Sequence, residues 1–145
     1  MSATSILLSA GAAALFALLY QCAWRSVAVA ALVAAVAWAL FLVVSAGPHR
    51  AVLGDAAGAL TASLVGELAA RWRHEPASVF VVPAIIPLVP GYTAYEAMRA
   101  LVAGHFLLGI EQATGALLVA GALAVGIAFG TAVWRSINPV RRPPA

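Results

Sequence analysis

The feature that most constrains this fold is a proline-rich interruption inside an apolar stretch, residues 79–104. Pro83, Pro87 and Pro90 each lack an amide hydrogen and clash with the preceding helical turn, and Gly91 follows directly. An unpaired backbone group in hydrocarbon costs several kcal/mol, so such a break survives only where protein or a water-filled cavity surrounds it. We therefore expect a broken helix whose break lies inside a protein assembly.

The spacing of the prolines predicts which backbone groups are freed and how deep they lie. A helix through this stretch leaves the carbonyls of Val79, Pro83 and Ile86 without donors. Residues 79–89 span about 16 Å as a helix, roughly half of a ~30 Å hydrocarbon core. We therefore expect the break, at residues 90–92, near the membrane midplane.

The second half-helix has a predicted start of its own. Thr93 and Glu96 have the spacing of a capping box, with Thr93 as N-cap and Glu96 as the third helical residue. The pattern predicts a discontinuous transmembrane helix, and it places the N-terminus of the second half at mid-membrane.

The composition predicts an all-α integral membrane protein. The chain has 145 residues, of which 64% are hydrophobic and 9% charged, and its mean hydropathy is +1.01. All eight basic residues are arginines scattered over loops and the tail, which argues against a nucleic-acid partner. Cys22 is the single cysteine and no Cys/His cluster is present, so neither a metal nor a cofactor is expected.

Hydropathy predicts a single membrane domain with about five spans and a basic, proline-rich tail. A short polar connection is expected at residues 104–112, and the histidines 49, 74 and 105 are expected at loop edges. The predicted segments are residues 4–24, 27–46, 51–70, 79–103 (broken at 90–92) and 113–134, followed by the tail, 135–145.

The third span differs from the others because small and charged residues share one broad face. Its small-residue stripe is expected to contact another helix closely, in a partner or a second copy. The neighbouring stripe carries Asp55 and Glu67, two possible proton-coupling residues; the plainer alternatives are an interfacial Asp55 and a Glu67–Arg71 pair. The two stripes are Gly54, Gly58, Ala62, Gly66 and Asp55, Ala59, Ser63, Glu67, Arg71. In the fifth span, Gly126 and Gly130 form a GxxxG arrangement that favours helix contact.

Arginine placement predicts the orientation. Five spans put six arginines on one side, against Arg50 and Arg99 on the other. The positive-inside rule then predicts an external N-terminus and a cytoplasmic C-terminus in a bacterial inner membrane.

The break has the chemistry of a substrate site. A half-helix N-terminus offers unpaired amides and a partial positive charge to a carboxylate, and secondary transporters build midplane sites in this way. Glu96 is a further proton-coupling candidate and is spaced to pair with Arg99, while Tyr92 and Tyr95 flank the break. The alternative is a packed, kinked helix in which Glu96 is only a cap. The candidate substrate-binding residues are Pro83, Ile86, Pro87, Pro90, Gly91, Tyr92, Thr93, Tyr95, Glu96 and Arg99.

The segment VPAIIPLVPGYTAYEAM, with the preceding GELAARWRHEPASVF, resembles the second half of the threonine/serine exporter family. It resembles especially the form in which a separate small subunit carries this half, and the detailed likeness covers residues 64–104. The resemblance implies proton-driven export of a small polar amino acid or a related carboxylate such as succinate, together with a partner subunit. The family's Pro-rich signature falls on Pro83, Pro87, Pro90, Gly91 and Tyr95.

Three classes of function are therefore compared. A transporter subunit is favoured, and a non-transporting subunit for assembly or stability is the alternative. An intramembrane enzyme is not expected, because the sequence has no paired histidines and no Ser/Lys or Asp/Asp constellation.

Overall fold

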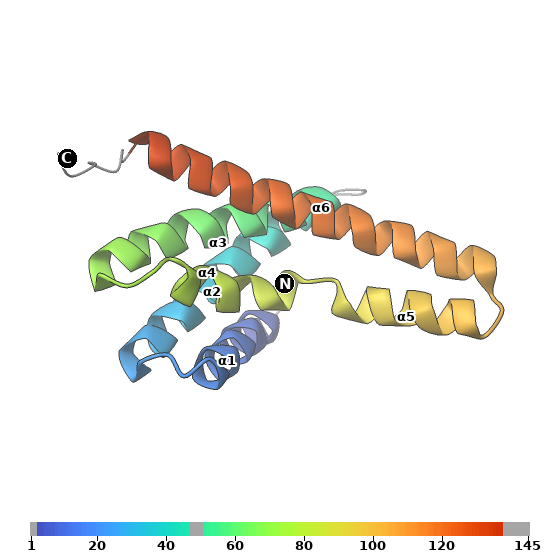
Figure 1. Cartoon of the computed structure of the whole chain (residues 1–145), viewed down its shortest axis with the longest axis horizontal. Helices are drawn as coiled ribbons and strands as arrows, with labels where there is room; N and C mark the ends of the chain where they lie inside the picture. Colours follow the sequence, from blue (N-terminus) through green and yellow to red (C-terminus); the bar gives the residue numbers. More distant parts are fainter. Residues whose placement is uncertain (1–2, 47–50, 138–145) are drawn as a thin grey trace, which may run out of the picture.

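The computed structural model describes residues 3–46 and 51–137, and this part of the chain is helical without a strand (Figure 1). The all-α prediction is confirmed. The elements are α1 (Ala3–Leu19), α2 (Trp24–Ser45), α3 (Ala51–Arg73), α4 (Ser78–Ile85), the 3₁₀ turn η1 (Ile86–Leu88), α5 (Gly91–Val102) and α6 (Phe106–Ile137).

Three of these helices, α2, α3 and α6, are long and apolar enough to cross a membrane. The pair Ser78–Leu88 and Gly91–Val102, bent by 47°, is a fourth span if it crosses as one unit. The apolar helix α1 has 17 residues, so its length of about 26 Å is slightly below a ~30 Å hydrocarbon core. The structure is thus that of a multi-pass membrane protein, while the count of five spans stays a prediction.

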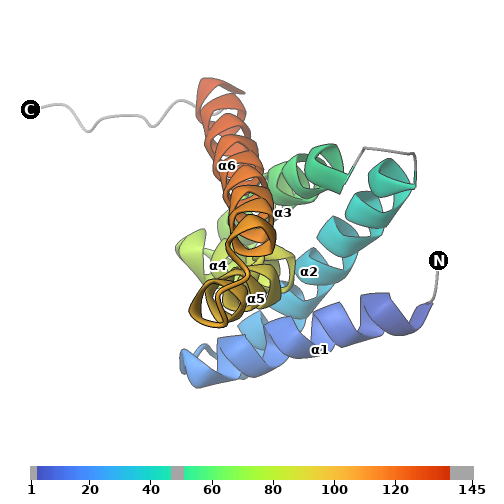
Figure 2. The ribbon, with the colours of Figure 1, turned by 90° about the vertical axis from the view of Figure 1, so that its right-hand side faces the viewer.

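The helices form a packed body and a projecting arm. In the body, α3 lies between α2 and α6, and α1 and α4 pack against α2 (Figures 1 and 2). The arm consists of α5 and residues 106–120 of α6; α5 packs along α6 and extends beyond the body. The break between η1 and α5 is the point where the chain leaves the body and enters the arm.

The small-residue stripe of α3 contacts helices of its own chain, which corrects the expected contact with a partner or second copy. A Cβ added at Gly54 would lie 2.9 Å from Ser45 Cβ of α2, and one added at Gly66 would lie 2.5 Å from Val81 Cγ2 of α4. Glycine removes the side chain that would keep these helices apart. The pattern therefore predicted close helix contact correctly, but α2 and α4 supply that contact.

The GxxxG arrangement of α6 is confirmed as a helix contact. A Cβ at Gly126 would lie 2.5 Å from the carbonyl oxygen of Ala56, and one at Gly130 would lie 2.7 Å from Ser63 Cβ. The Ser63 hydroxyl donates a hydrogen bond across this seam to the carbonyl of Ile127, at 3.3 Å. Between them, the two stripes of α3 therefore contact α2, α4 and α6.

The polar connection expected at residues 104–112 is wrong, because α6 already begins at Phe106. Gly104 adopts φ +83°, so the chain reverses within a few residues, and the apolar run after His105 continues as helix. His74 and His105 are exposed in connections, as expected. The predicted turn at 47–50, with His49, and the tail beyond residue 137 lie outside the described residues.

A polar contact fixes the start of the broken helix. The Ser26 hydroxyl, in the first turn of α2, donates to the Glu75 carboxylate at 2.6 Å from Oε1 and 2.7 Å from Oε2. Arg73 Nη2 lies 3.6 Å from the same carboxylate. Because Glu75 lies just before α4, this cluster positions α4 against α2.

Candidate functional site

The first half-helix ends in a tightened turn. After the buried Pro83, the chain passes into η1, where the Val89 amide donates to the Ile86 carbonyl at 3.2 Å. A 3₁₀ turn closes its hydrogen bonds one residue earlier than an α-helix. The prediction of a free carbonyl at Ile86 is therefore wrong, because this turn supplies a donor despite the missing amide of Pro90.

The second half-helix starts earlier than expected. Pro90 is its N-cap without a side-chain hydrogen bond, and the Pro90 carbonyl accepts from the Ala94 amide at 3.0 Å. The predicted capping box is therefore wrong, because Thr93 and Glu96 already lie inside α5. Glu96 instead accepts a charged hydrogen bond from Arg99, with Nη2 and Oε2 2.8 Å apart, which confirms the predicted spacing for a pair.

Two backbone amides at this start have no acceptor in the part of the chain that the structure describes. The Gly91 amide donates to the Val89 carbonyl at 2.8 Å, but the amides of Tyr92 and Thr93 make no backbone hydrogen bond within the described residues. The first amides of a helix carry a partial positive charge. The break therefore presents two donors suited to a carboxylate.

The break is open on its outer side. Tyr92 is 78% exposed and Tyr95 is 64% exposed, and a Cβ at Gly91 would meet no atom within 4 Å. Because φ at Gly91 is not positive, its turn does not require glycine, and the missing side chain only leaves space. Within the described residues, nothing covers this face.

A groove of about 430 Å³ runs from the break along the seam between α5 and α6. Its lining is apolar and consists largely of small side chains. These residues are Val89, Pro90, Gly91, Ala94, Ala97, Met98, Leu101, Ala113, Ala116, Leu117 and Ala120.

The groove places the break beside the middle of the longest helix. Ala120, which lines the groove with Pro90 and Gly91, lies 14 residues after Phe106 and 17 before Ile137. These intervals correspond to about 21 Å and about 26 Å of helix. The break therefore lies beside the middle of α6, while its depth in a membrane stays a prediction.

The inner side of the break is plugged by Leu88, the last residue of η1, which is 5% exposed. Leu88 packs with Ala59 and Leu123, and its Cδ1 would lie 3.1 Å from a Cβ at Gly58. Trp38 of α2 packs against the same cluster, which we call the plug cluster: Trp38, Gly58, Ala59, Leu88 and Leu123.

The three carboxylates considered for proton coupling are separated by the fold. Asp55 is 6% exposed and lies one helical turn before Ala59 of the plug cluster. Glu67 is half-buried, 12 residues further along α3, a rise of about 18 Å. Glu96 lies on the arm and pairs with Arg99. Only Glu96 is close to the α5 N-terminus along the chain.

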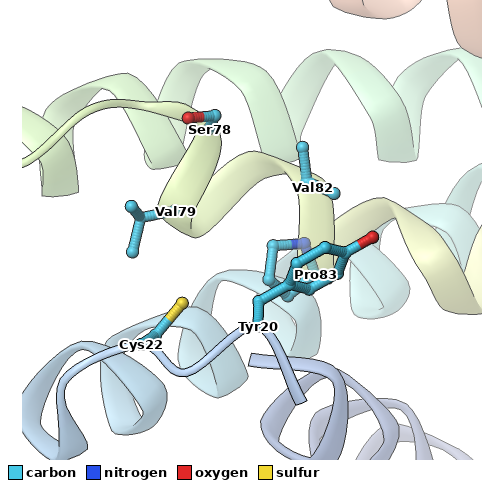
Figure 3. Close-up of a pocket in the computed structure, with 6 residues that line it drawn as sticks. All are labelled: Tyr20, Cys22, Ser78, Val79, Val82 and Pro83. Atoms are coloured by element: carbon cyan, nitrogen blue, oxygen red, sulfur yellow. The ribbon is translucent and has the colours of Figure 1, made fainter. Parts of the chain in front are cut away.

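A second cavity, of about 320 Å³, lies at the other end of the broken helix. Figure 3 shows Tyr20 and Cys22, from the α1–α2 connection, beside Val79 and Pro83 of α4. The lining of this cavity includes the hydroxyls of Tyr20 and Ser78 and the Cys22 thiol. Pro83, predicted for the substrate site, thus lines this cavity rather than the groove.

Sequence reasoning missed the alanines of the groove and the leucine of the plug cluster. The alanines have a readable signal, because Ala113, Ala116 and Ala120 are spaced as one helix face and Ala94 and Ala97 as another. Leu88 has no such signal, since nothing local distinguishes it from its apolar neighbours.

Comparisons with known proteins agree with the sequence resemblance. The model of the family described as threonine/serine exporter, ThrE, matches residues 5–133. A curated threonine/serine exporter of Corynebacterium glutamicum is 33% identical over 134 residues, which are 91% of this chain and 26% of the relative. The chain therefore spans about a quarter of that relative's length. No solved structure matches the chain.

Proposed function

Because this chain belongs to the threonine/serine exporter family, we propose that it is one subunit of a proton-coupled secondary transporter. Its substrate is a small polar amino acid such as threonine or serine, or a small carboxylate such as succinate. The observation that carries this proposal is the break, where the unpaired amides of Tyr92 and Thr93 open a helix beside the middle of α6.

The chemistry of the site supports carboxylate recognition. Two backbone donors and the positive end of α5 complement a carboxylate without any cationic side chain in direct contact. Tyr92 and Tyr95 supply hydroxyls beside the same helix start. These features suit a group that threonine, serine and succinate all share, so they define a class of substrate rather than one member.

The exposed surface of the arm supports the proposal of a partner subunit. Glu96 and Arg99 form a charged pair on α5, and charged side chains at membrane depth face protein or water rather than lipid. The tip of the arm also exposes Val102 at 86% and Leu107 at 88%. We propose that a partner subunit, carrying family sequence outside the matched quarter of the relative, covers this face and closes the site.

The positions of the basic residues support an orientation in the membrane. The first turn of α2 and the last turns of α3 and α6, which carry Arg25, Arg73 and Arg135, lie at one end of the molecule in Figure 1. We propose that this end is cytoplasmic in a bacterial inner membrane, with the N-terminus outside. A reporter active only in the cytoplasm should function when fused after Ala145, and activity of an exclusively external reporter there would contradict the orientation.

Efflux tests the proposal. Cells that make this chain together with its partner are loaded with labelled threonine, serine or succinate. We expect efflux of at least one of them above that of cells without the chain, and slower efflux when a protonophore removes the proton gradient. An intact, inserted assembly that exports none of the three would contradict the exporter proposal and favour a role in assembly.

A further inference from the structure

We propose that Asp55 is the proton-binding residue of this exporter and that it acts from the inner side of the break. The inference rests on the proposed proton-coupled function and selects one carboxylate among Asp55, Glu67 and Glu96. Asp55 takes a proton from water on one side of the membrane and releases it to water on the other, with only an O–H bond broken and re-formed. Substrate moves outward as the proton moves inward.

The first argument is burial. Asp55 is 6% exposed, in the part of α3 that packs against α2 and α6, and it makes no hydrogen bond within the described residues. An ionised carboxylate is costly in apolar surroundings unless it is paired, whereas a neutral carboxylic acid is tolerated. Within the part of the chain that the structure describes, Asp55 is thus largely buried and unpaired, while its carboxylate oxygens are not among the fully buried unpaired polar atoms and keep a small accessible area through which a proton can enter or leave.

The second argument is the absence of titratable side chains from the middle of the packed elements, because Arg25 of α2 and Glu111 and Arg135 of α6 lie toward the ends of their helices. Residues 26–45 of α2, 78–88 of α4 and η1, and 113–134 of α6 contain none. On α3 itself, the nearest is Glu67, about 18 Å away by helical rise, and Arg71 and Arg73 lie beyond it. His49 and Arg50 precede α3 in sequence and lie outside the described residues.

The third argument favours a proton over a metal cation. A hard cation needs about six oxygen ligands, but a proton needs one. The nearest hydroxyls along α3 are those of Thr61 and Ser63, about 9 Å and about 12 Å from Asp55 by helical rise, and they donate to the carbonyls of Ala57 and Ile127. The described residues contain no group of three or more His, Cys, Asp or Glu side chains that could hold a metal ion.

The fourth argument connects Asp55 with the break. It lies one turn from Gly58 and Ala59, which contact Leu88 in the plug cluster. The indole nitrogen of Trp38, in the same cluster, is buried and has no acceptor within the described residues. In our proposal this indole N–H donates to the ionised form of Asp55, so that deprotonation rearranges the packing around Leu88.

Carbodiimide labelling tests the inference without transport. Dicyclohexylcarbodiimide attacks protonated carboxyls in apolar sites, and peptide mass spectrometry identifies the modified residue. In the purified chain, we expect Asp55 to be modified faster than the exposed Glu111, at a rate that falls about tenfold per pH unit above the pKa of the reacting carboxyl. Glu67→Gln and Glu96→Gln should retain this labelling, whereas Asp55→Asn should abolish it.

Two variants separate the proposal from a structural role. The side chain of Asp55→Asn resembles the protonated carboxyl, so the melting temperature of this variant should stay close to that of the wild type. A large drop in melting temperature would indicate that Asp55 is ionised and paired, and it would overturn the inference. Trp38→Phe should speed labelling, because it removes the donor to the ionised form. If the carbodiimide leaves Asp55 unmodified, or modifies it no faster than Glu111, the inference is also overturned.

The outcomes also separate this inference from the exporter proposal. Labelling of Asp55 in a chain that exports nothing would overturn the exporter proposal and leave Asp55 as a protonated, buried carboxyl without a role in transport. Conversely, proton-dependent efflux without labelling of Asp55 would overturn only its assignment as the proton-binding residue.

Discussion

Gly126→Leu is expected to prevent stable folding of the chain, whereas Gly121→Leu on the same helix is expected to be tolerated. A Cβ at Gly126 would lie 2.5 Å from the Ala56 carbonyl oxygen and 3.0 Å from the Leu60 nitrogen, which are backbone atoms of α3. Overpacking usually costs about 1–3 kcal/mol, and more where backbone must move. We expect a loss above about 3 kcal/mol, measured as yield and melting temperature in detergent.

The control variant Gly121→Leu separates the effect of helix packing from the effect of helix propensity. Gly121 lies inside α6 like Gly126, but a Cβ there would meet no atom within 4 Å. Both substitutions therefore change the intrinsic helix preference alike, and only one enters the seam with α3. Equal yields and melting temperatures for the two variants would contradict the packing described here.

Gly91→Leu is the second substitution with a large expected effect, and it should act on transport rather than folding. The new side chain would enter open space at the start of α5 and meet no atom of the described chain at its Cβ. Small displacements at a reacting or binding centre can cost about a hundredfold in rate, and we expect an efflux loss of that order. The melting temperature of the chain should change little.

Gly11→Leu provides the matched control, because Gly11 lies in α1 and its Cβ would also be free of contacts within 4 Å. It should export normally. The size of the assembly, measured by native mass spectrometry, shows which occupant the leucine displaces. If the assembly becomes smaller, the leucine has displaced the partner subunit from the space beside residue 91. If the assembly keeps its size and efflux is lost, the leucine has displaced the substrate. Normal efflux from Gly91→Leu would contradict a site at the break.

The broken helix could be predicted from sequence because its cause is local. Pro90 has no amide to donate, whatever packs around it, so a break at this point follows from covalent structure. The start of α5 could not be predicted from the capping box. The Pro90 carbonyl accepts from Ala94 at 3.0 Å, and this turn is complete before Thr93 can act as a cap.

The partner of the small-residue stripe could not be predicted for a different reason. Glycines four residues apart show that a helix approaches, but the pattern contains no information on which helix does so. Here Gly54 meets α2 and Gly66 meets α4, so the predicted interface with another chain is an interior contact. The arm was missed because the short turn at Gly104 depends on a backbone conformation, φ +83°, that hydropathy does not reveal.

The alternation of small and polar residues on α3 did predict which of its faces is covered by protein. It placed Asp55 on a broad protein-facing side, and the structure confirms that Gly54, Asp55 and Gly58 are buried together. What the sequence did not show is that Leu88, at the end of the first half-helix, inserts beside this face. That contact depends on the bend of the chain at the break.

The central claim, that the start of α5 binds the carboxylate of the substrate, is tested most directly by substrate protection. Thr93→Cys in a Cys22→Ser background places the single thiol in the first turn of α5, next to the unpaired amides. Ser136→Cys, near the end of α6, gives the matched control. Modification by a water-soluble thiol reagent is followed in membrane vesicles that contain the chain and its partner. We expect threonine to slow modification at position 93 but not at position 136, and threoninol, which lacks the carboxylate, to leave both rates unchanged. Equal protection by threonine and threoninol, or none by threonine, serine or succinate, would contradict carboxylate binding at the break.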